Sequence, residues 1–239
     1  MRHLLAALAL LAAALPRATS QAPAPDSTLP AEDWADLARF ADDNARVLAE
    51  APAAEPRVVF MGNSITEGWP AADAAFWERH PNFLNRGISG QTTEQMLVRF
   101  RPDVVALAPA VVVLHAGVND FAYNTGAMTP EETYGNLVSM VQLARANGIA
   151  PVLASIPHAT AFTWRPGAGN RVAEIVALNA RLRAFAAAEG VPYVDYHAAM
   201  ADDAGDLAAE YAADSVHPTP AGYRVMGPVV EAGIAEALR

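Results

Sequence analysis

The chain has 239 residues, no cysteine and a formal net charge of −10 at pH 7. Its length favours one domain with a sizeable buried core, and the lack of cysteine excludes disulfides. The acidity argues against nucleic acid or an anionic membrane as a partner.

Residues 1–20 have the pattern of a secretory signal peptide. A short basic start precedes an apolar stretch over 4–16 and small residues at 18–20 that suit a cleavage site. The apolar stretch is too short to span a membrane, and no cysteine follows it to carry a lipid, so the sequence predicts no stable membrane anchor. We expect a secreted or periplasmic bacterial protein, and we disfavour the alternative of a buried N-terminal helix.

A leader and a first helix come next. Residues 21–30 are rich in proline and alanine, which is typical of a flexible leader. Over 31–51, apolar residues recur near helical spacing and predict a helix that packs ahead of the first strand. These apolar residues are Trp34, Leu37, Phe40 and Leu48.

The remainder, 57–239, alternates between strand and helix patterns. Short apolar runs predict strands at 57–61, 83–86, 111–115, 150–155 and 193–195. Such alternation implies right-handed crossovers. The sequence therefore predicts an α/β fold, a three-layer sandwich with a central five-stranded parallel sheet, in a single domain over 31–239.

The helices between these strands have recognisable ends. A capping box with proline at the first helical position begins one helix at Thr129, and Gly148 ends it. A second helix is predicted over about 171–189, and the last begins at Thr219. Pro228 lies inside that last helix and is predicted to kink or split it.

Chemically distinctive residues follow the strand ends. Ser64 comes after the first strand, Gly90 after the second and Asn119 after the third, while Asp214 and His217 come after the last. Ligands of parallel α/β sheets bind outside the carboxyl ends of the strands. Ser64, Gly90, Asn119 and His217, four residues remote in sequence, are therefore expected at one edge of the sheet.

The same residue types suit nucleophilic catalysis. A serine hydroxyl needs a base to take its proton, and His217 can serve as that base while Asp214 fixes its tautomer. The Asp-x-x-His spacing places both side chains on one side of a turn. By themselves these residues would suggest a surface Asp and a capping His, but Ser64 and Asn119 favour the catalytic interpretation.

In these segments the chain resembles the SGNH hydrolase superfamily, also called the GDSL esterases and lipases. The superfamily is named for residues matched here by Ser64, Gly90, Asn119 and His217. The resemblance runs from about residue 57 to 239 and implies a flavodoxin-like fold. It also implies an oxyanion hole formed by the N–H groups of Ser64 and Gly90 and by the Asn119 amide. The chain departs from the family where Asn63 and Gln91 replace acidic residues, which bears on the subfamily.

Other residues are candidates for substrate contact. Trp69, Tyr123, His158 and Trp164 lie in predicted loops near the site, although packing is the more usual role of such residues. Asp195 and His197 resemble a second dyad, but no serine motif accompanies them. The sequence indicates no metal, because its His and acidic residues do not cluster. It indicates no cofactor either, because it lacks a phosphate loop and a dinucleotide fingerprint.

These observations lead to a functional hypothesis. We expect a secreted serine esterase that hydrolyses short-chain carboxylic esters, such as O-acetyl groups on saccharides, through an acyl-Ser64 intermediate. The expected partner is thus a small-molecule or saccharide ester, and the oligomeric state stays open. A lysophospholipase or thioesterase is the alternative enzyme and would need a hydrophobic tunnel. A non-catalytic carbohydrate-binding protein or a small-ligand-binding flavodoxin-like domain is disfavoured.

Overall fold

The computed structural model describes residues 33–50 and 55–239. Its centre is a five-stranded sheet with the order β2-β1-β3-β4-β5, and all neighbouring strands are parallel. The strands are β1 (Val58–Gly62), β2 (Phe83–Gly87), β3 (Val111–His115), β4 (Ala150–Ala154) and β5 (Tyr193–Val194). The predicted fold class is confirmed, and each strand begins and ends within one residue of its predicted bounds. The proposed signal peptide and leader lie outside the described residues.

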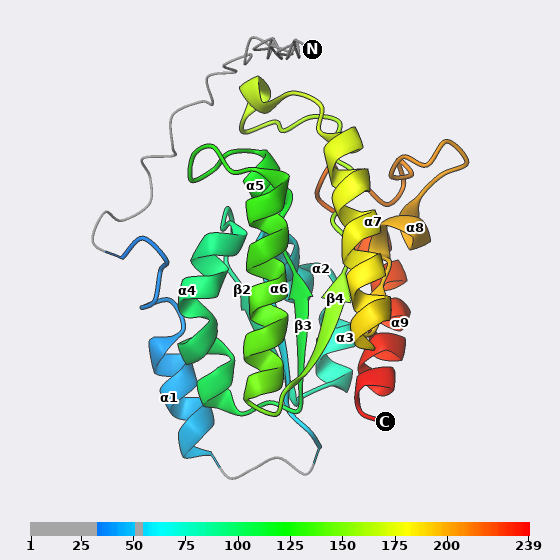
Figure 1. Cartoon of the computed structure of the whole chain (residues 1–239). Coiled ribbons are helices and arrows are strands. Elements are labelled where there is room, and N and C mark those ends of the chain that lie inside the picture. The colour runs from blue at the N-terminus through cyan, green and yellow to red at the C-terminus, as the bar shows by residue number, and fades with distance from the viewer. Residues whose placement is uncertain (1–32, 51–54) are drawn as a thin grey trace, which may run out of the picture.

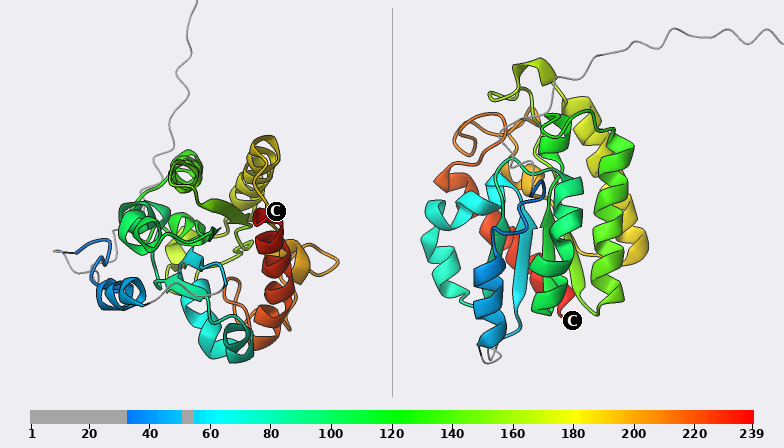
Figure 2. Two further views of the ribbon diagram at one scale, coloured as in Figure 1. Left: turned by 90° about the horizontal axis from the view of Figure 1, so that it is seen from below. Right: turned by 90° about the vertical axis from the view of Figure 1, so that its left-hand side faces the viewer.

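Helices cover both faces of the sheet (Figures 1 and 2). One face carries α4 (Thr93–Asp103), α6 (Pro130–Ala146) and α7 (Val172–Glu189), with α1 (Ala41–Ala49) packed beside α4. The other carries α2 (Ser64–Ala72), α3 (Ala74–Arg79), α8 (Tyr196–Met200) and α9 (Pro220–Ala237). Short turns complete the chain: η1 (Val105–Leu107), α5 (Val118–Phe121) and η2 (Pro166–Ala168). Strands β1 and β3 are buried along their whole length, as a sheet covered on both faces requires.

Local signals set the helix ends. The predicted capping box at Thr129 is present: its hydroxyl accepts the Glu132 N–H at 3.2 Å, and the Glu132 carboxylate accepts the Thr129 N–H at 2.7 Å. Helix α9 runs unbroken through Pro228, so the predicted split is wrong. Pro228 and Arg224 are both exposed, so the Arg224 carbonyl that loses its helical donor can bond water instead.

The N-terminal helix differs most from its prediction. It begins at Ala41 rather than near residue 31, and Trp34 and Leu48 are exposed. The buried face is centred on Val47 and on a polar residue, Asn44. The Asn44 amide donates to the Asp103 carboxylate at 2.7 Å and accepts from Arg86 at 3.0 Å. The spacing of apolar residues could not predict the buried face of this helix, because that face is held partly by the hydrogen bonds of Asn44.

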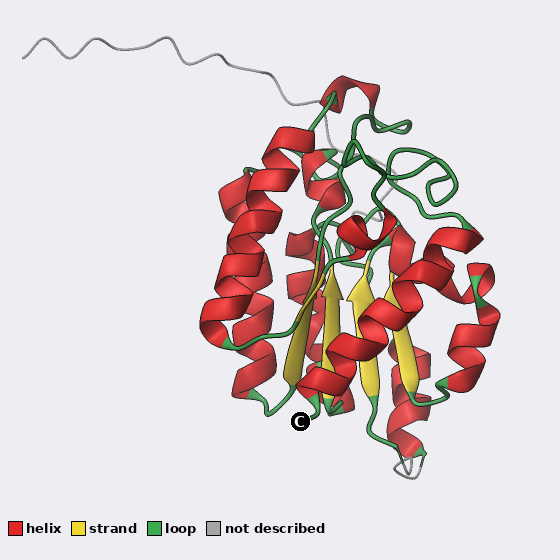
Figure 3. Ribbon diagram, turned by 90° about the vertical axis from the view of Figure 1, so that its right-hand side faces the viewer, coloured by secondary structure: helices red, strands yellow, loops and turns green. Residues whose placement is uncertain are grey.

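The carboxyl ends of the strands meet at one edge of the sheet. The long loops gather above this edge, at the top of Figures 1 and 3. They are the connections after β3 and β4 and the segment between α8 and α9. Among the described residues, no helix is both long and apolar enough to cross a membrane.

Candidate active site

Ser64 is the first residue of α2, directly after β1. Asn63 caps the helix, because its side-chain oxygen accepts the Ile65 N–H at 3.1 Å. The first N–H groups of a helix have no acceptor within the helix, so the Ser64 N–H is available to a ligand. It also lies at the positive end of the helix dipole, which favours negative charge there.

Two glycines allow α2 to begin this close to the sheet. A Cβ atom on Gly62 would lie 2.0 Å from the Thr66 hydroxyl oxygen, and one on Gly87 would lie 2.2 Å from the Glu67 backbone nitrogen. Real Cβ atoms do not approach other atoms so closely. The first turn of α2 therefore rests on the ends of β1 and β2, and the position of Ser64 follows from that contact.

Ser64, His217 and Asp214 form a hydrogen-bonded relay. The Ser64 Oγ lies 2.9 Å from His217 Nε2, and His217 Nδ1 lies 3.0 Å from Asp214 Oδ2. An ionised carboxylate only accepts hydrogen bonds, so Nδ1 carries the imidazole proton and Nε2 offers its lone pair to the serine. The three residues predicted as catalytic are thus brought together.

The turn that contains the dyad keeps Asp214 ionised. Burial opposes its charge, but hydrogen bonds from the His217 ring and from the N–H groups of His217 and Val216 outweigh that effect and lower the pKa of Asp214. Both backbone N–H groups donate to Asp214 Oδ1 at 2.7 Å. One carboxylate oxygen is therefore bound to the turn, and the other faces the imidazole.

Gly90 and Asn119 lie near one another, because Asn119 binds the residue that follows Gly90. Gly90 has φ +79°, a left-handed conformation that favours glycine. The Asn119 amide is buried and donates to the Gln91 carbonyl at 3.0 Å. An amide nitrogen has two N–H donors, so the second remains for an oxyanion. Asn119 thus holds the loop that carries Gly90, and its second N–H stays a candidate donor of the predicted oxyanion hole.

Asp120 is a buried residue that the sequence did not single out. Its carboxylate accepts the Thr93 N–H at 3.0 Å and also the Thr93 hydroxyl, which ties α5 to the start of α4. Burial raises the pKa of Asp120 to about 7, against the hydrogen bonds from Thr93 that lower it. Asp120 thus fixes the helix that follows the Gly90 loop.

The aromatic candidates separate into core and surface. The assignment of Trp69 to substrate binding is wrong: its indole is 1% exposed and stacks on Phe76 with ring centroids 4.9 Å apart. Trp164 is 36% exposed, and its ring centroid lies 5.5 Å from that of His217. Tyr123 is half-buried and packs under the Arg171 guanidinium. Only Trp164 contacts the relay.

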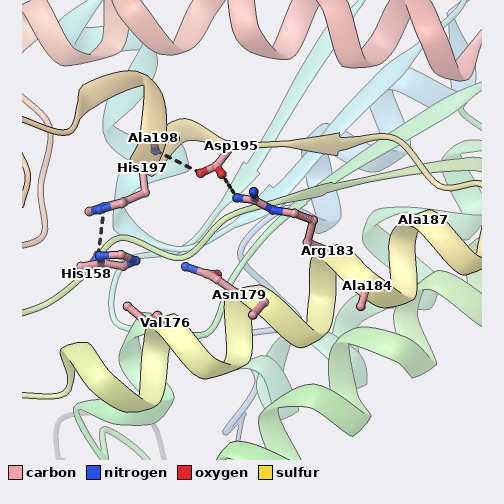
Figure 4. Close-up of a pocket in the computed structure, with 10 residues that line it drawn as sticks. His158, Val176, Asn179, Arg183, Ala184, Ala187, Asp195, His197 and Ala198 are labelled. Carbon is pink, nitrogen blue, oxygen red and sulfur yellow. Dashed lines mark hydrogen bonds and ion pairs between the residues drawn. The ribbon is translucent and has the colours of Figure 1, made fainter. Parts of the chain in front are cut away.

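His158 and the Asp195–His197 pair border a different pocket (Figure 4). This pocket has a volume of about 520 Å³, and Ser64 is not among the residues that line it. His158 stacks on His197, with ring centroids 3.3 Å apart. Asp195 binds Arg183 and the N–H of Ala198, while His197 Nε2 lies 2.9 Å from the Gly205 carbonyl. As predicted, Asp195 and His197 form no second dyad.

His158 also lines a smaller cavity of about 130 Å³ together with Asp214. Ser64 lines neither of these cavities, so the proposed contact of His158 with substrate has no support from its placement. No group of three or more His, Cys, Asp or Glu side chains suited to a metal occurs in residues 33–50 and 55–239.

A serine with its base and an orienting carboxylate, at the carboxyl edge of a parallel sheet, defines the class of serine hydrolases. The sequence model of the GDSL-like lipase/acylhydrolase family matches residues 60–225. The chain belongs to this family. The resemblance to the SGNH hydrolases is thereby confirmed, and so is the expectation of a hydrolase.

Individual relatives agree with this assignment. A crystal structure of a GDSL-like lipase from Bacteroides thetaiotaomicron is 44% identical, has a TM-score of 0.80, and covers 85% of this chain and 99% of that chain. Esterase TesA of Pseudomonas aeruginosa is 30% identical over 188 residues, which are 73% of this chain and 85% of the relative. A Bacillus subtilis lipoprotein, YqeF, is 36% identical over 112 residues, or 40% of this chain, and the match spans only 46% of that relative's length.

Proposed function

We propose that the protein is an esterase that cleaves short-chain carboxylic esters through an acyl-Ser64 intermediate. The observation that carries this proposal is the relay from Asp214 to His217 to Ser64, with hydrogen-bond distances of 3.0 and 2.9 Å. The relay is complete, which a carbohydrate-binding protein on the same fold would not require.

In the proposed mechanism each of these residues takes one step. Ser64 Oγ bonds to the ester carbonyl carbon as its proton passes to His217 Nε2. The carbonyl oxygen becomes negative and takes hydrogen bonds from the N–H groups of Ser64 and Gly90 and from the Asn119 amide. The carbon–oxygen bond to the alcohol then breaks, and His217 returns the proton to the departing alcohol. A water molecule then attacks the acyl-Ser64 carbonyl as His217 takes its proton. The bond to Ser64 Oγ breaks, His217 returns the proton to Ser64, and the carboxylic acid leaves.

Two features support a small acyl group on a larger polar alcohol. Phe121 and Phe162, two aromatic residues of the segments after β3 and β4, are buried in the core and so are not available to line an open apolar channel. Trp164 remains on the surface next to His217, and an indole face suits a sugar ring. Together with the signal-peptide pattern, this favours O-acetylated saccharides encountered outside the cytoplasm.

A panel of p-nitrophenyl esters from acetyl to dodecanoyl, run beside acetylated xylan, tests the proposal. We expect kcat/KM to peak between acetyl and butyryl and to fall steeply by octanoyl. A longer chain gains its roughly 0.8 kcal/mol per methylene only when it is covered. A rise through dodecanoyl would support the lysophospholipase alternative instead.

The nucleophile is tested by Ser64→Ala, with Ser139→Ala as the matched control. The Ser139 hydroxyl donates to a carbonyl of its own helix, α6, away from the relay. Ser64→Ala should abolish hydrolysis and covalent labelling by a fluorophosphonate while the melting temperature stays unchanged. Near-normal turnover by a folded Ser64→Ala protein would overturn the proposed function.

A further inference from the structure

Asn124 lies between the loop around Gly90 and the loop after β4 that carries Trp164. The proposed mechanism assigns it no role. Its side chain is 7% exposed, and both ends of the amide are occupied. The amide nitrogen donates to the Gly90 carbonyl at 2.8 Å, and the amide oxygen accepts the Trp164 indole N–H at 3.0 Å. One side chain thus links the oxyanion loop to the loop after β4.

The Gly90 loop is held on consecutive carbonyls by two side-chain amides. Asn124 holds the carbonyl of Gly90, and Asn119 holds that of Gln91. Without such contacts a glycine at φ +79° could rotate freely, because a glycine backbone has many accessible conformations. Asn124 and Asn119 thus fix the peptide units that follow Gly90. The Gly90 N–H, which the oxyanion needs, belongs to the preceding unit, and the φ and ψ angles of Gly90 set its direction relative to that anchor.

The backbone adopts an unfavourable conformation to bring Asn124 here. Tyr123, the residue before it, has φ +58°, which is uncommon for a bulky side chain. Residues held in such conformations cluster at functional sites. The next residue, Thr125, also reaches the same loop, since its hydroxyl donates to the Thr92 hydroxyl at 3.3 Å.

Trp164 lies on the leaving-alcohol side of the site. His217 returns its proton to the departing alcohol, so the alcohol passes next to the imidazole. The Trp164 ring centroid is 5.5 Å from that imidazole. Its loop is also fixed to the dyad turn, because the Ser215 hydroxyl donates to the Ala161 carbonyl at 2.5 Å and accepts the Ala161 N–H at 3.2 Å.

We propose that Asn124 is a positioning residue whose side-chain amide couples Trp164, at the leaving-alcohol side, to the Gly90 carbonyl of the oxyanion loop. This inference rests on the proposed esterase function, and it adds a link between alcohol recognition and oxyanion stabilisation. The carboxamide offers an acceptor to Trp164 on one atom and a donor to the Gly90 carbonyl on the other. Aspartate keeps the acceptor for Trp164 but places a second acceptor against the Gly90 carbonyl.

The first test compares Asn124→Asp with Asn170→Asp on p-nitrophenyl acetate. Asn170 is exposed at the end of the loop that carries Trp164, and its side-chain oxygen accepts the Val172 N–H, a role that aspartate can keep. We expect Asn124→Asp to lower kcat by about tenfold or more with KM within about twofold, in keeping with one lost donor to an oxyanion loop. Asn170→Asp should change neither constant by more than about twofold. Equal kcat values for the two variants would overturn the proposal.

The second test is a double-mutant cycle with Trp164→Phe and Asn124→Ala, which also serves if Asn124→Asp does not fold. Trp164→Phe keeps the ring beside His217 but removes the N–H that orients the amide. Coupling predicts that Trp164→Phe lowers kcat about threefold in the wild type and adds nothing in the Asn124→Ala protein. Effects that multiply independently would overturn it.

A third readout needs no turnover. The indole N–H signal of Trp164, identified by its loss in Trp164→Phe, should exchange slowly with solvent in the wild type and at least about tenfold faster in Asn124→Ala. An unchanged exchange rate would overturn the Asn124–Trp164 link even if esterase activity were found. Absence of ester hydrolysis in the wild type, with that link intact, would overturn the proposed function instead.

Discussion

Two regions at the carboxyl edge of the sheet have similar side chains. The first region contains Asp214, His217 and Asn119. The second region, around the pocket of Figure 4, contains Asp195, His197 and Asn179. Both regions thus combine an aspartate, a histidine and a buried asparagine. The regions differ in the partners to which these side chains form hydrogen bonds.

In the second region the hydrogen bonds of these side chains go to structural partners. One Asp195 oxygen accepts the Ala198 N–H and caps α8, and the other binds Arg183. The Asn179 amide binds both the N–H and the carbonyl of Ile156, at 2.9 and 2.8 Å. In the first region Asp214 Oδ2 binds the His217 imidazole, and that imidazole binds the Ser64 hydroxyl. Residue type alone does not make a site; the first region is distinguished by hydrogen bonds that lead to a nucleophile.

The largest expected effect comes from exchanging the two histidines for alanine. His217→Ala removes the base and should lower kcat by about 10³- to 10⁶-fold. His197→Ala loses the Gly205 contact and the stack on His158, and should lower stability by about 1–3 kcal/mol with kcat nearly unchanged. Steady-state kinetics and urea unfolding of both variants measure this. A dead His197→Ala beside an active His217→Ala would reverse the assignment of the two regions.

Substitution of the two aspartates should likewise lower kcat in the first region and stability in the second, with smaller effects than the histidine variants. Asp214→Asn retains an acceptor but allows the wrong imidazole tautomer, and should lower kcat by about 10²- to 10⁴-fold. Asp195→Asn can still cap α8 and loses only the exposed pair with Arg183, a change of about 1 kcal/mol or less in stability. Comparable kcat values for the two variants would contradict the role given to Asp214.

The asparagines sharpen the comparison further. Asn119→Ala should lower kcat by about 10²- to 10³-fold and leave KM nearly unchanged, because its free N–H serves the oxyanion. Asn179→Ala should leave kcat nearly unchanged and lower the free energy of unfolding by about 1–3 kcal/mol, since two buried backbone groups lose their partner. A KM effect with kcat preserved would move Asn119 to substrate binding.

The smallest effect concerns pH and the second region. Burial, with His197 beside it, lowers the pKa of His158 to about 4. The unfolded chain therefore takes up a proton at higher pH than the folded one, so stability is present above about pH 6.5 and declines as pH falls toward 4. His158→Gln should flatten the melting temperature over that window. An unchanged slope would show that His158 does not titrate in the stacked pair.

Particular residues show how far the sequence could be read. The strands were predictable because parallel strands buried on both faces are short apolar runs, and Ser64, Gly90, Asn119 and His217 because each follows a strand end. Trp69 was misplaced because a loop was expected where α2 begins, and in a helix its indole turns into the core. Asn124 and Asn44 were missed because their partners lie far away in the chain. Only the fold shows that Asn124 meets both Gly90 and Trp164.

The contact of α2 with Gly62 and Gly87 bears on how this scaffold can change. Any side chain at either position would push the first turn of the helix off the sheet and carry the nucleophile with it. Substitutions at Gly62 and Gly87 are thus poor routes by which natural variation or laboratory evolution could adjust the position of Ser64 relative to the sheet. Both processes must redesign the loops after β3 and β4 around a fixed point of attack, so libraries aimed at new esters belong in those loops.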